Sequence, residues 1–211
     1  LLVAGIAIRL PGHATAAAIA LAAVTIIAAA YLRGRITGLR EASASGLPVT
    51  VITVVAASLP FAIAGFVGVL GAGLVNDDMA SHLLFTEWLD SRAGETPELV
   101  DDGYPLGPHA LVAAAARVTG ASLIEAFAGL TGAIAVLTAL TAYTALPGTR
   151  SLLRAPASVL AAFSYLGAAY LAQGAFKEPM LGLGLLGFAL SLSALRGGSP
   201  ARRSTRWAAG R

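Results

Sequence analysis

Long apolar stretches separated by short polar ones dominate the chain. A helix needs about 20 apolar residues to cross roughly 30 Å of hydrocarbon. Five stretches approach or exceed that length, and they are residues 13–32, 47–75, 122–146, 156–173 and 179–195. Residues 1–8 have the same character and end at a Pro-Gly pair, so we interpret them as the end of a further helix. The pattern predicts an all-α membrane protein with about five transmembrane helices, and the chain is expected to be a fragment of a longer protein.

The composition supports a membrane protein and excludes several kinds of chemistry. Hydrophobic residues make up 57% of the chain and charged residues 12%, whereas soluble domains carry about a quarter charged residues. The absence of cysteine excludes disulfides, thiolate metal sites and a cysteine nucleophile. The sequence has no P-loop, dinucleotide fingerprint, HExxH motif or zinc-ligand spacing. We therefore expect no metal site and no dissociable cofactor.

The basic residues indicate how the helices are oriented. Arginines gather in segments 33–46, 147–155 and 196–211, which fall on one side of the membrane if each span crosses once. Segments 76–108 and 173–178 then fall on the other side. Because basic loops stay in the cytoplasm, residues 1–195 are expected to form a transmembrane domain of a bacterial plasma membrane protein, and residues 196–211 a cytoplasmic tail.

The same reasoning explains the formal net charge of +3 as a topology signal. A nucleic-acid partner is therefore not expected, whereas membrane lipids are. Segment 76–108 is the long extracytoplasmic loop, and it holds eight of the chain's eleven acidic residues. Apolar residues at helical spacing predict short interfacial helices at 78–92 and 109–119. Arg117 and Glu125 lie in apolar surroundings, where a charge is costly unless it faces protein or water.

Asp77 and Asp78 are the acidic residues whose position suggests chemistry. They directly follow an apolar run, and partial desolvation at a membrane surface raises the pKa of a carboxylate. Such a carboxylate suits a general base acting on a hydroxyl group. His82 follows Asp78 by four residues, so a helix places both on one face. The alternative is that an aspartate caps the helix N-terminus without any further function.

Two later clusters are further candidates. Tyr104 and His109 lie in YPLGPH, where two prolines and a glycine predict a stiff, non-helical entry to the next helix. The alternative is an interfacial aromatic residue beside a helix start. Lys177 and Glu178 lie in a short external turn, where a cation suits the phosphate of a lipid carrier. The alternative there is a solvated pair of opposite charges.

Three motifs together resemble the GT-C class of polytopic glycosyltransferases, especially the bacterial mannosyltransferase and aminoarabinose-transferase types. They are VNDDMASH after a span, YPLGPH before the next membrane helix, and the later AFKEP turn. The resemblance implies that a sugar is transferred from a polyprenyl-phosphate donor to a lipid, glycan or protein acceptor of the cell envelope.

The resemblance also implies roles for individual residues. Asp77 or Asp78 would be the catalytic carboxylate that activates the acceptor, and Lys177 would contact the donor phosphate. His82, Tyr104 and His109 would belong to the wall of the same cavity, and Glu178 accompanies Lys177 as a candidate for substrate binding.

A transporter or flippase-like protein is the alternative function, and a structural membrane protein is a third. A transporter predicts ionisable residues deep in several spans and helices broken by Gly or Pro in paired repeats. The predicted spans carry almost no ionisable residues and the sequence shows no internal repeat. These features favour the enzyme.

Overall fold

The computed structural model describes residues 2–33, 39–65, 77–92, 94–147 and 149–196. All secondary structure in these ranges is α-helical, as the hydrophobic pattern predicts. The helices are α1 (Leu2–Ala7), α2 (His13–Arg33), α3 (Leu39–Ala64), α4 (Asp77–Ser91), α5 (Glu98–Asp101), α6 (Gly107–Thr119), α7 (Leu123–Ala145), α8 (Ser151–Ala162), α9 (Tyr165–Gln173) and α10 (Lys177–Arg196).

Three of the described helices are long and apolar enough to cross a membrane, and they contain His13–Tyr31, Ser45–Ala64 and Leu123–Ala145. A bent pair, α8 with α9, makes a fourth candidate if the two helices form one span. The membrane class predicted from the sequence is therefore confirmed, with three or four candidate spans. The predicted fifth span corresponds to α10, which is not among these candidates. Residues 66–75 of the predicted second span lie outside the described residues.

The span predicted as continuous over residues 156–173 is instead two helices that meet at 50°. The helix α8 ends at Ala162, and Ser164 starts α9 by accepting a hydrogen bond from the Gly167 backbone N–H at 3.4 Å. A serine at this position competes with the continuing helix for backbone hydrogen bonds. A Cβ at Gly167 would collide with the carbonyl oxygen of Ala162, so the bend also requires glycine there. Hydropathy alone does not reveal such a break.

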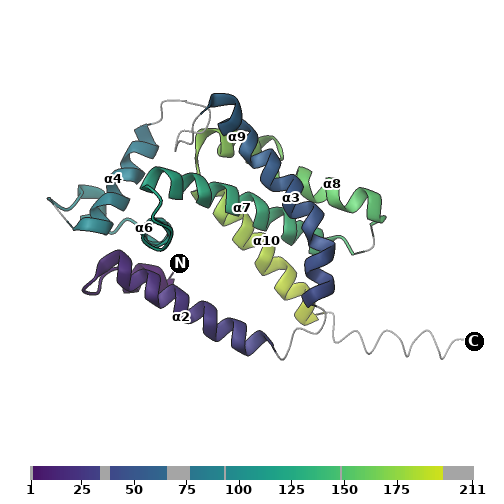
Figure 1. The fold of residues 1–211 in the computed structure, drawn as a ribbon, viewed down its shortest axis with the longest axis horizontal. Helices are drawn as coiled ribbons and strands as arrows, with labels where there is room; N and C mark the ends of the chain where they lie inside the picture. The colour runs from purple at the N-terminus through teal and green to yellow at the C-terminus, as the bar shows by residue number, and fades with distance from the viewer. Residues whose placement is uncertain (1, 34–38, 66–76, 93, 148, 197–211) are drawn as a thin grey trace, which may run out of the picture.

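The helix α7 lies at the centre of the fold and packs against α3, α6, α8 and α10. Figure 1 shows it crossing the middle of the molecule, with α4 and α6 at one end and α8 at the other. Phe176, directly before α10, packs against Phe127 near the start of α7, with ring centroids 5.4 Å apart, and Leu183 of α10 belongs to the same cluster as Ile134 of α7. The turn before α10 and the segment before α7 therefore lie at the same end of α7.

A basic side chain of α8 contacts the opposite end of α7. The Arg154 guanidinium donates to the Tyr143 carbonyl oxygen from Nε at 3.0 Å and from Nη2 at 2.8 Å. Its Cζ also lies 3.8 Å from the centroid of the Tyr143 ring. The last turn of a helix leaves carbonyl groups without intrahelical partners, and Arg154 satisfies one of them. Arg154 thereby fixes the connection from α7 to α8.

The two short helices predicted around the acidic loop are present as α4 and α6, and a charge pair joins them. Arg117 donates from Nε and Nη2 to the two carboxylate oxygens of Asp90, at 2.9 Å each. Glu125 accepts from the Ser122 backbone N–H at 2.8 Å and completes a capping box at the start of α7. Both charges that looked costly in the sequence therefore have partners.

Candidate functional site

Two buried histidines form the centre of the candidate site. His82 of α4 is 1% exposed and His109 of α6 is 0% exposed. His109 Nε2 and His82 Nδ1 lie 2.9 Å apart, so one ring donates and the other accepts. An imidazolium carries a proton on both nitrogens. The two rings therefore cannot both be protonated while this hydrogen bond is kept.

Aromatic side chains surround the pair and exclude water from it. The Phe176 ring centroid lies 5.1 Å from that of His82 and 5.6 Å from that of His109. Phe85 and Phe127 complete the enclosure, with centroids 5.8 Å and 6.3 Å from that of His109. Burial, together with the charges of His82 and Lys177, lowers the pKa of His109 to about 3. His109 is therefore neutral near pH 7.

Tyr104 and Lys177 adjoin the histidine pair. The Lys177 Nζ donates to the Tyr104 hydroxyl oxygen at 3.1 Å and lies 5.7 Å from the centroid of the Tyr104 ring. The Tyr104 ring centroid lies 6.1 Å from that of His82 and 5.9 Å from that of His109. A cation, a phenol and two imidazoles from three separate segments of the chain thus meet in one cluster. We refer to His82, Tyr104, His109 and Lys177 as the histidine–lysine cluster.

The local sequence explains why these side chains converge. In α4, helical spacing places Met79, His82 and Phe85 on one face, and all three are buried. Tyr104 is held by its backbone N–H, which donates to the Leu99 carbonyl oxygen at 2.9 Å. Gly103 before it has φ +89°, a conformation that glycine adopts without strain.

The entry to α6 is non-helical over residues 104–106. The helix starts at Gly107, and a proline occupies its first turn, where the missing N–H costs nothing. His109 therefore lies within the first turn, with a fixed backbone direction. The YPLGPH segment thus holds both Tyr104 and His109, while Lys177 reaches them from the first turn of α10.

The structure brings together four of the seven site residues predicted from the sequence, namely the members of the histidine–lysine cluster. Asp77 and Asp78 open α4, and His82 follows Asp78 by one helical turn. The side chains of Asp77 and Asp78 lie outside the described part of the structure. Lys177 and Glu178 belong to the first turn of α10 instead of the preceding external turn.

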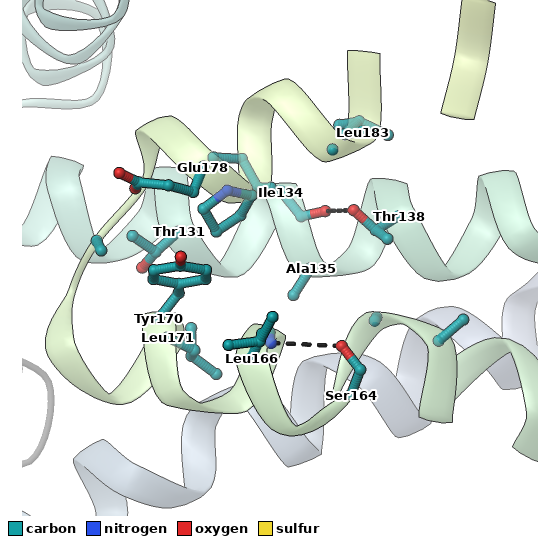
Figure 2. A pocket seen from close by; sticks show the side chains of 16 residues that line it. Thr131, Ile134, Ala135, Thr138, Ser164, Leu166, Tyr170, Leu171, Glu178 and Leu183 are labelled. Atoms are coloured by element: carbon teal, nitrogen blue, oxygen red, sulfur yellow. Dashed lines mark hydrogen bonds between the residues drawn. The ribbon is translucent and has the colours of Figure 1, made fainter. Parts of the chain in front are cut away.

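Glu178 lies away from the cluster. Its exposed side chain lines a separate cavity of about 230 Å³ between α7, α9 and α10. Figure 2 shows this cavity with Tyr170 pointing toward Thr131 and with Ser164 at the start of α9. The hydroxyl of Thr138 in its wall donates to the Ile134 carbonyl oxygen at 2.8 Å. The walls are otherwise largely apolar.

The sequence did not single out the phenylalanines or the arginines near the site. Phe176 lies within the quoted AFKEP turn, but a phenylalanine in a membrane protein carries no signal by itself. Arg9 and Arg92 line a second cavity on which Tyr104 also borders. Within the described ranges, no group of three or more His, Asp or Glu residues is arranged to hold a metal ion.

The long apolar helices define an α-helical integral membrane protein. The histidine–lysine cluster adds a buried polar site, at the end of α7 that adjoins α4 and α6. In comparisons with known proteins, no family model, no curated protein and no solved structure matches the chain.

Proposed function

We propose that the protein is a membrane glycosyltransferase of the GT-C type, which moves a sugar from a polyprenyl-phosphate donor to a lipid, glycan or protein acceptor. The observation that carries this proposal is the Lys177–Tyr104 hydrogen bond beside the histidine pair. The resemblance to GT-C proteins assigns Lys177, Tyr104, His82 and His109 to one cavity although they are distant in sequence. Their proximity supports that grouping.

In the proposed reaction, Asp77 or Asp78 accepts the proton of the acceptor hydroxyl group. The acceptor oxygen attacks the anomeric carbon, the bond from that carbon to the phosphate oxygen breaks, and the configuration inverts. The Lys177 ammonium offsets the charge that develops on the departing polyprenyl phosphate. No dissociable cofactor takes part. The buried histidine pair joins α4 to α6 one turn from Asp78 and thereby positions the start of α4.

We also propose that the acidic loop faces the extracytoplasmic side of the bacterial plasma membrane. Positive-inside topology requires the acidic loop and the turn before α10 to share one side. The contact between Lys177 and Tyr104 supports this arrangement. The Arg154 contact at the opposite end of α7 agrees with a cytoplasmic position for the basic loop.

The test is transfer activity in purified protein with mannosyl- and aminoarabinosyl-polyprenyl phosphates as donors. Asp77→Asn and Asp78→Asn are measured singly and together, with Glu95→Gln as the matched control because Glu95 is an exposed acid in the same loop. Removal of a general base lowers the rate by about 100-fold or more. We therefore expect a decrease of that size in one of the single variants and in the double variant. Full activity in both single variants would overturn the proposal.

A flippase-like function is the second candidate, because the α8–α9 pair is bent by 50° beside a cavity. Discontinuous helices form substrate sites in many transporters. This candidate predicts movement of a lipid-linked sugar across proteoliposomes without bond cleavage. In that case Gly167→Ala, which obstructs the bend, would lower translocation, and Asp78→Asn would leave it unchanged.

A further inference from the structure

An open cavity of about 1070 Å³ borders Tyr104 but is not lined by His82, His109 or Lys177. Its walls come from the turn after α1, the end of α4 and the segment before α6. Two basic side chains, Arg9 and Arg92, line it together with Trp88 and Tyr104. The cavity thus combines two guanidinium groups with aromatic surfaces.

The Arg92 side chain is held in place by neighbours on two sides. Its Cζ lies 4.1 Å from the centroid of the Trp88 ring, and its Nη2 donates to the Ile8 carbonyl oxygen at 3.4 Å. The Nε atom is buried and has no hydrogen-bond partner among the described residues. A fixed guanidinium group with an unused donor is already arranged to bind an acceptor.

The backbone of Arg92 adopts a left-handed conformation that is strained for an arginine. Its φ is +52°, and its N–H donates to the Trp88 carbonyl oxygen at 2.7 Å, so Arg92 closes the end of α4. Glycine is the usual residue at this left-handed position. An arginine here carries a conformational cost, and strained non-glycine residues cluster at functional sites.

Among the described residues, the charges of Arg9 and Arg92 also have no counterion. Burial and the charge of Arg9 lower the pKa of Arg92. Asp101 lines the same cavity, yet no carboxylate among the described residues lies within ion-pair distance of either arginine. Arg9 is exposed and Arg92 is half-buried. Their like charges repel each other, and a bound anion removes that repulsion.

We propose that Arg9 and Arg92 form a binding site for a phosphate group whose carrier occupies the cavity. Two guanidinium groups offer several donors to a tetrahedral anion that carries more than one charge. Trp88 and Tyr104 provide surface for the apolar part of the carrier. Apart from Tyr104, which borders both sites, it uses other residues than the proposed transfer and does not depend on it.

Trp88 makes the site measurable without any catalytic assay. The chain has two tryptophans, so Trp207→Phe leaves Trp88 as the only reporter. Inorganic pyrophosphate is titrated into detergent-solubilised protein against sodium chloride of equal ionic strength. In a second arm, the emission is compared between nanodiscs of phosphatidylglycerol and of phosphatidylcholine. We expect a saturable change in Trp88 fluorescence with pyrophosphate, a difference in Trp88 fluorescence between the two kinds of nanodisc, or both. A response to pyrophosphate indicates a soluble ligand, and a response to phosphatidylglycerol alone indicates a lipid headgroup.

Arg9→Gln and Arg92→Gln should each weaken this response by about tenfold or more, as expected for a lost hydrogen bond to a charged group. Arg92→Gly fits the left-handed backbone and should remain folded, as a thermal melt will show, yet lose the response. Arg117→Gln is the matched control, because Arg117 is paired with Asp90 outside the cavity. The absence of a response in both arms, or an equal response in the Arg9 and Arg92 variants, would overturn the proposal.

Discussion

His82 and His109 are hydrogen-bonded to each other at 2.9 Å although 27 residues separate them in the chain. The bond joins α4 to α6 inside an aromatic enclosure that excludes water. A buried pair of this kind requires that at least one ring nitrogen in the bond stays unprotonated. It therefore links the packing of these two helices to the protonation state of the site.

The first prediction concerns the stability of the fold at acidic pH. Because the pKa of His109 falls from 6.5 to about 3, the unfolded chain binds this proton more readily than the folded one. The contribution of His109 to the free energy of unfolding is therefore complete above pH 6.5 and is lost as the pH falls toward 3. At pH 5 the loss amounts to about 2 kcal/mol for this group. Thermal melts in detergent between pH 7.5 and 4.5 measure it, and His109→Gln should flatten the profile. A midpoint independent of pH in the unmodified chain would contradict the assignment.

The second prediction concerns the histidine bond itself. His82→Leu or His109→Leu alone leaves a buried ring nitrogen without its partner, which costs about 1–3 kcal/mol. The double replacement removes both polar groups and should cost less than the sum of the two single changes. A double-mutant cycle from chemical unfolding gives the coupling energy directly. Strict additivity of the two single changes would show that the 2.9 Å contact contributes nothing to stability.

The third prediction concerns Lys177. Under the proposed function, Lys177→Met removes the charge that offsets the departing phosphate and should lower transfer by about 100-fold, as for other groups that stabilise a developing charge. Tyr104→Phe keeps the aromatic ring and removes the hydroxyl that accepts the hydrogen bond from Lys177. The transfer rate should therefore fall less than in Lys177→Met. Arg150→Gln, an exposed basic residue at the other end of α7, is the control. Equal rates for Lys177→Met and the control would exclude Lys177 from the reaction.

The fourth prediction concerns the bend between α8 and α9. Gly167→Ala places a methyl group against the Ala162 carbonyl oxygen and should destabilise the fold by about 1–3 kcal/mol, as overpacking does. Gly184→Ala in α10 is the matched control, because a Cβ there meets nothing within 4 Å. That control should be neutral or slightly stabilising. Equal melting temperatures for the two variants would mean that the bend adapts without cost.

Much of the fold could be predicted because membrane helices follow directly from apolar length. The helices α2 and α7 match the predicted spans within a few residues. The break at Ser164 was missed, because a single capping serine scarcely changes the mean hydropathy of a span. The number of five spans is not confirmed by the three or four candidates in the described residues.

The candidate site was predictable only in part. His82 was a candidate because it follows Asp78 by four residues, Tyr104 and His109 because of the stiff YPLGPH segment, and Lys177 as a cation in a short turn. These four residues do lie together. The surrounding phenylalanines carried no such signal, since their neighbours come from helices that are distant in sequence. Arg92 is the single arginine of the acidic loop, which by itself predicts no function. Its contact with the Ile8 carbonyl oxygen depends on a tertiary approach that spacing does not encode.

If α8 and α9 form one span, the bend between them also fixes how this helix pair is rotated about its own axis. A break in a helix leaves backbone carbonyl and N–H groups without their usual partners, and hydrocarbon offers them none. The open side of the bend must therefore face protein or water, and Ser164 and Gly167 do line the cavity beside α7. Leu160, which is exposed and does not line that cavity, is left to face lipid. A local break in such a span thus determines which of its faces the bilayer contacts.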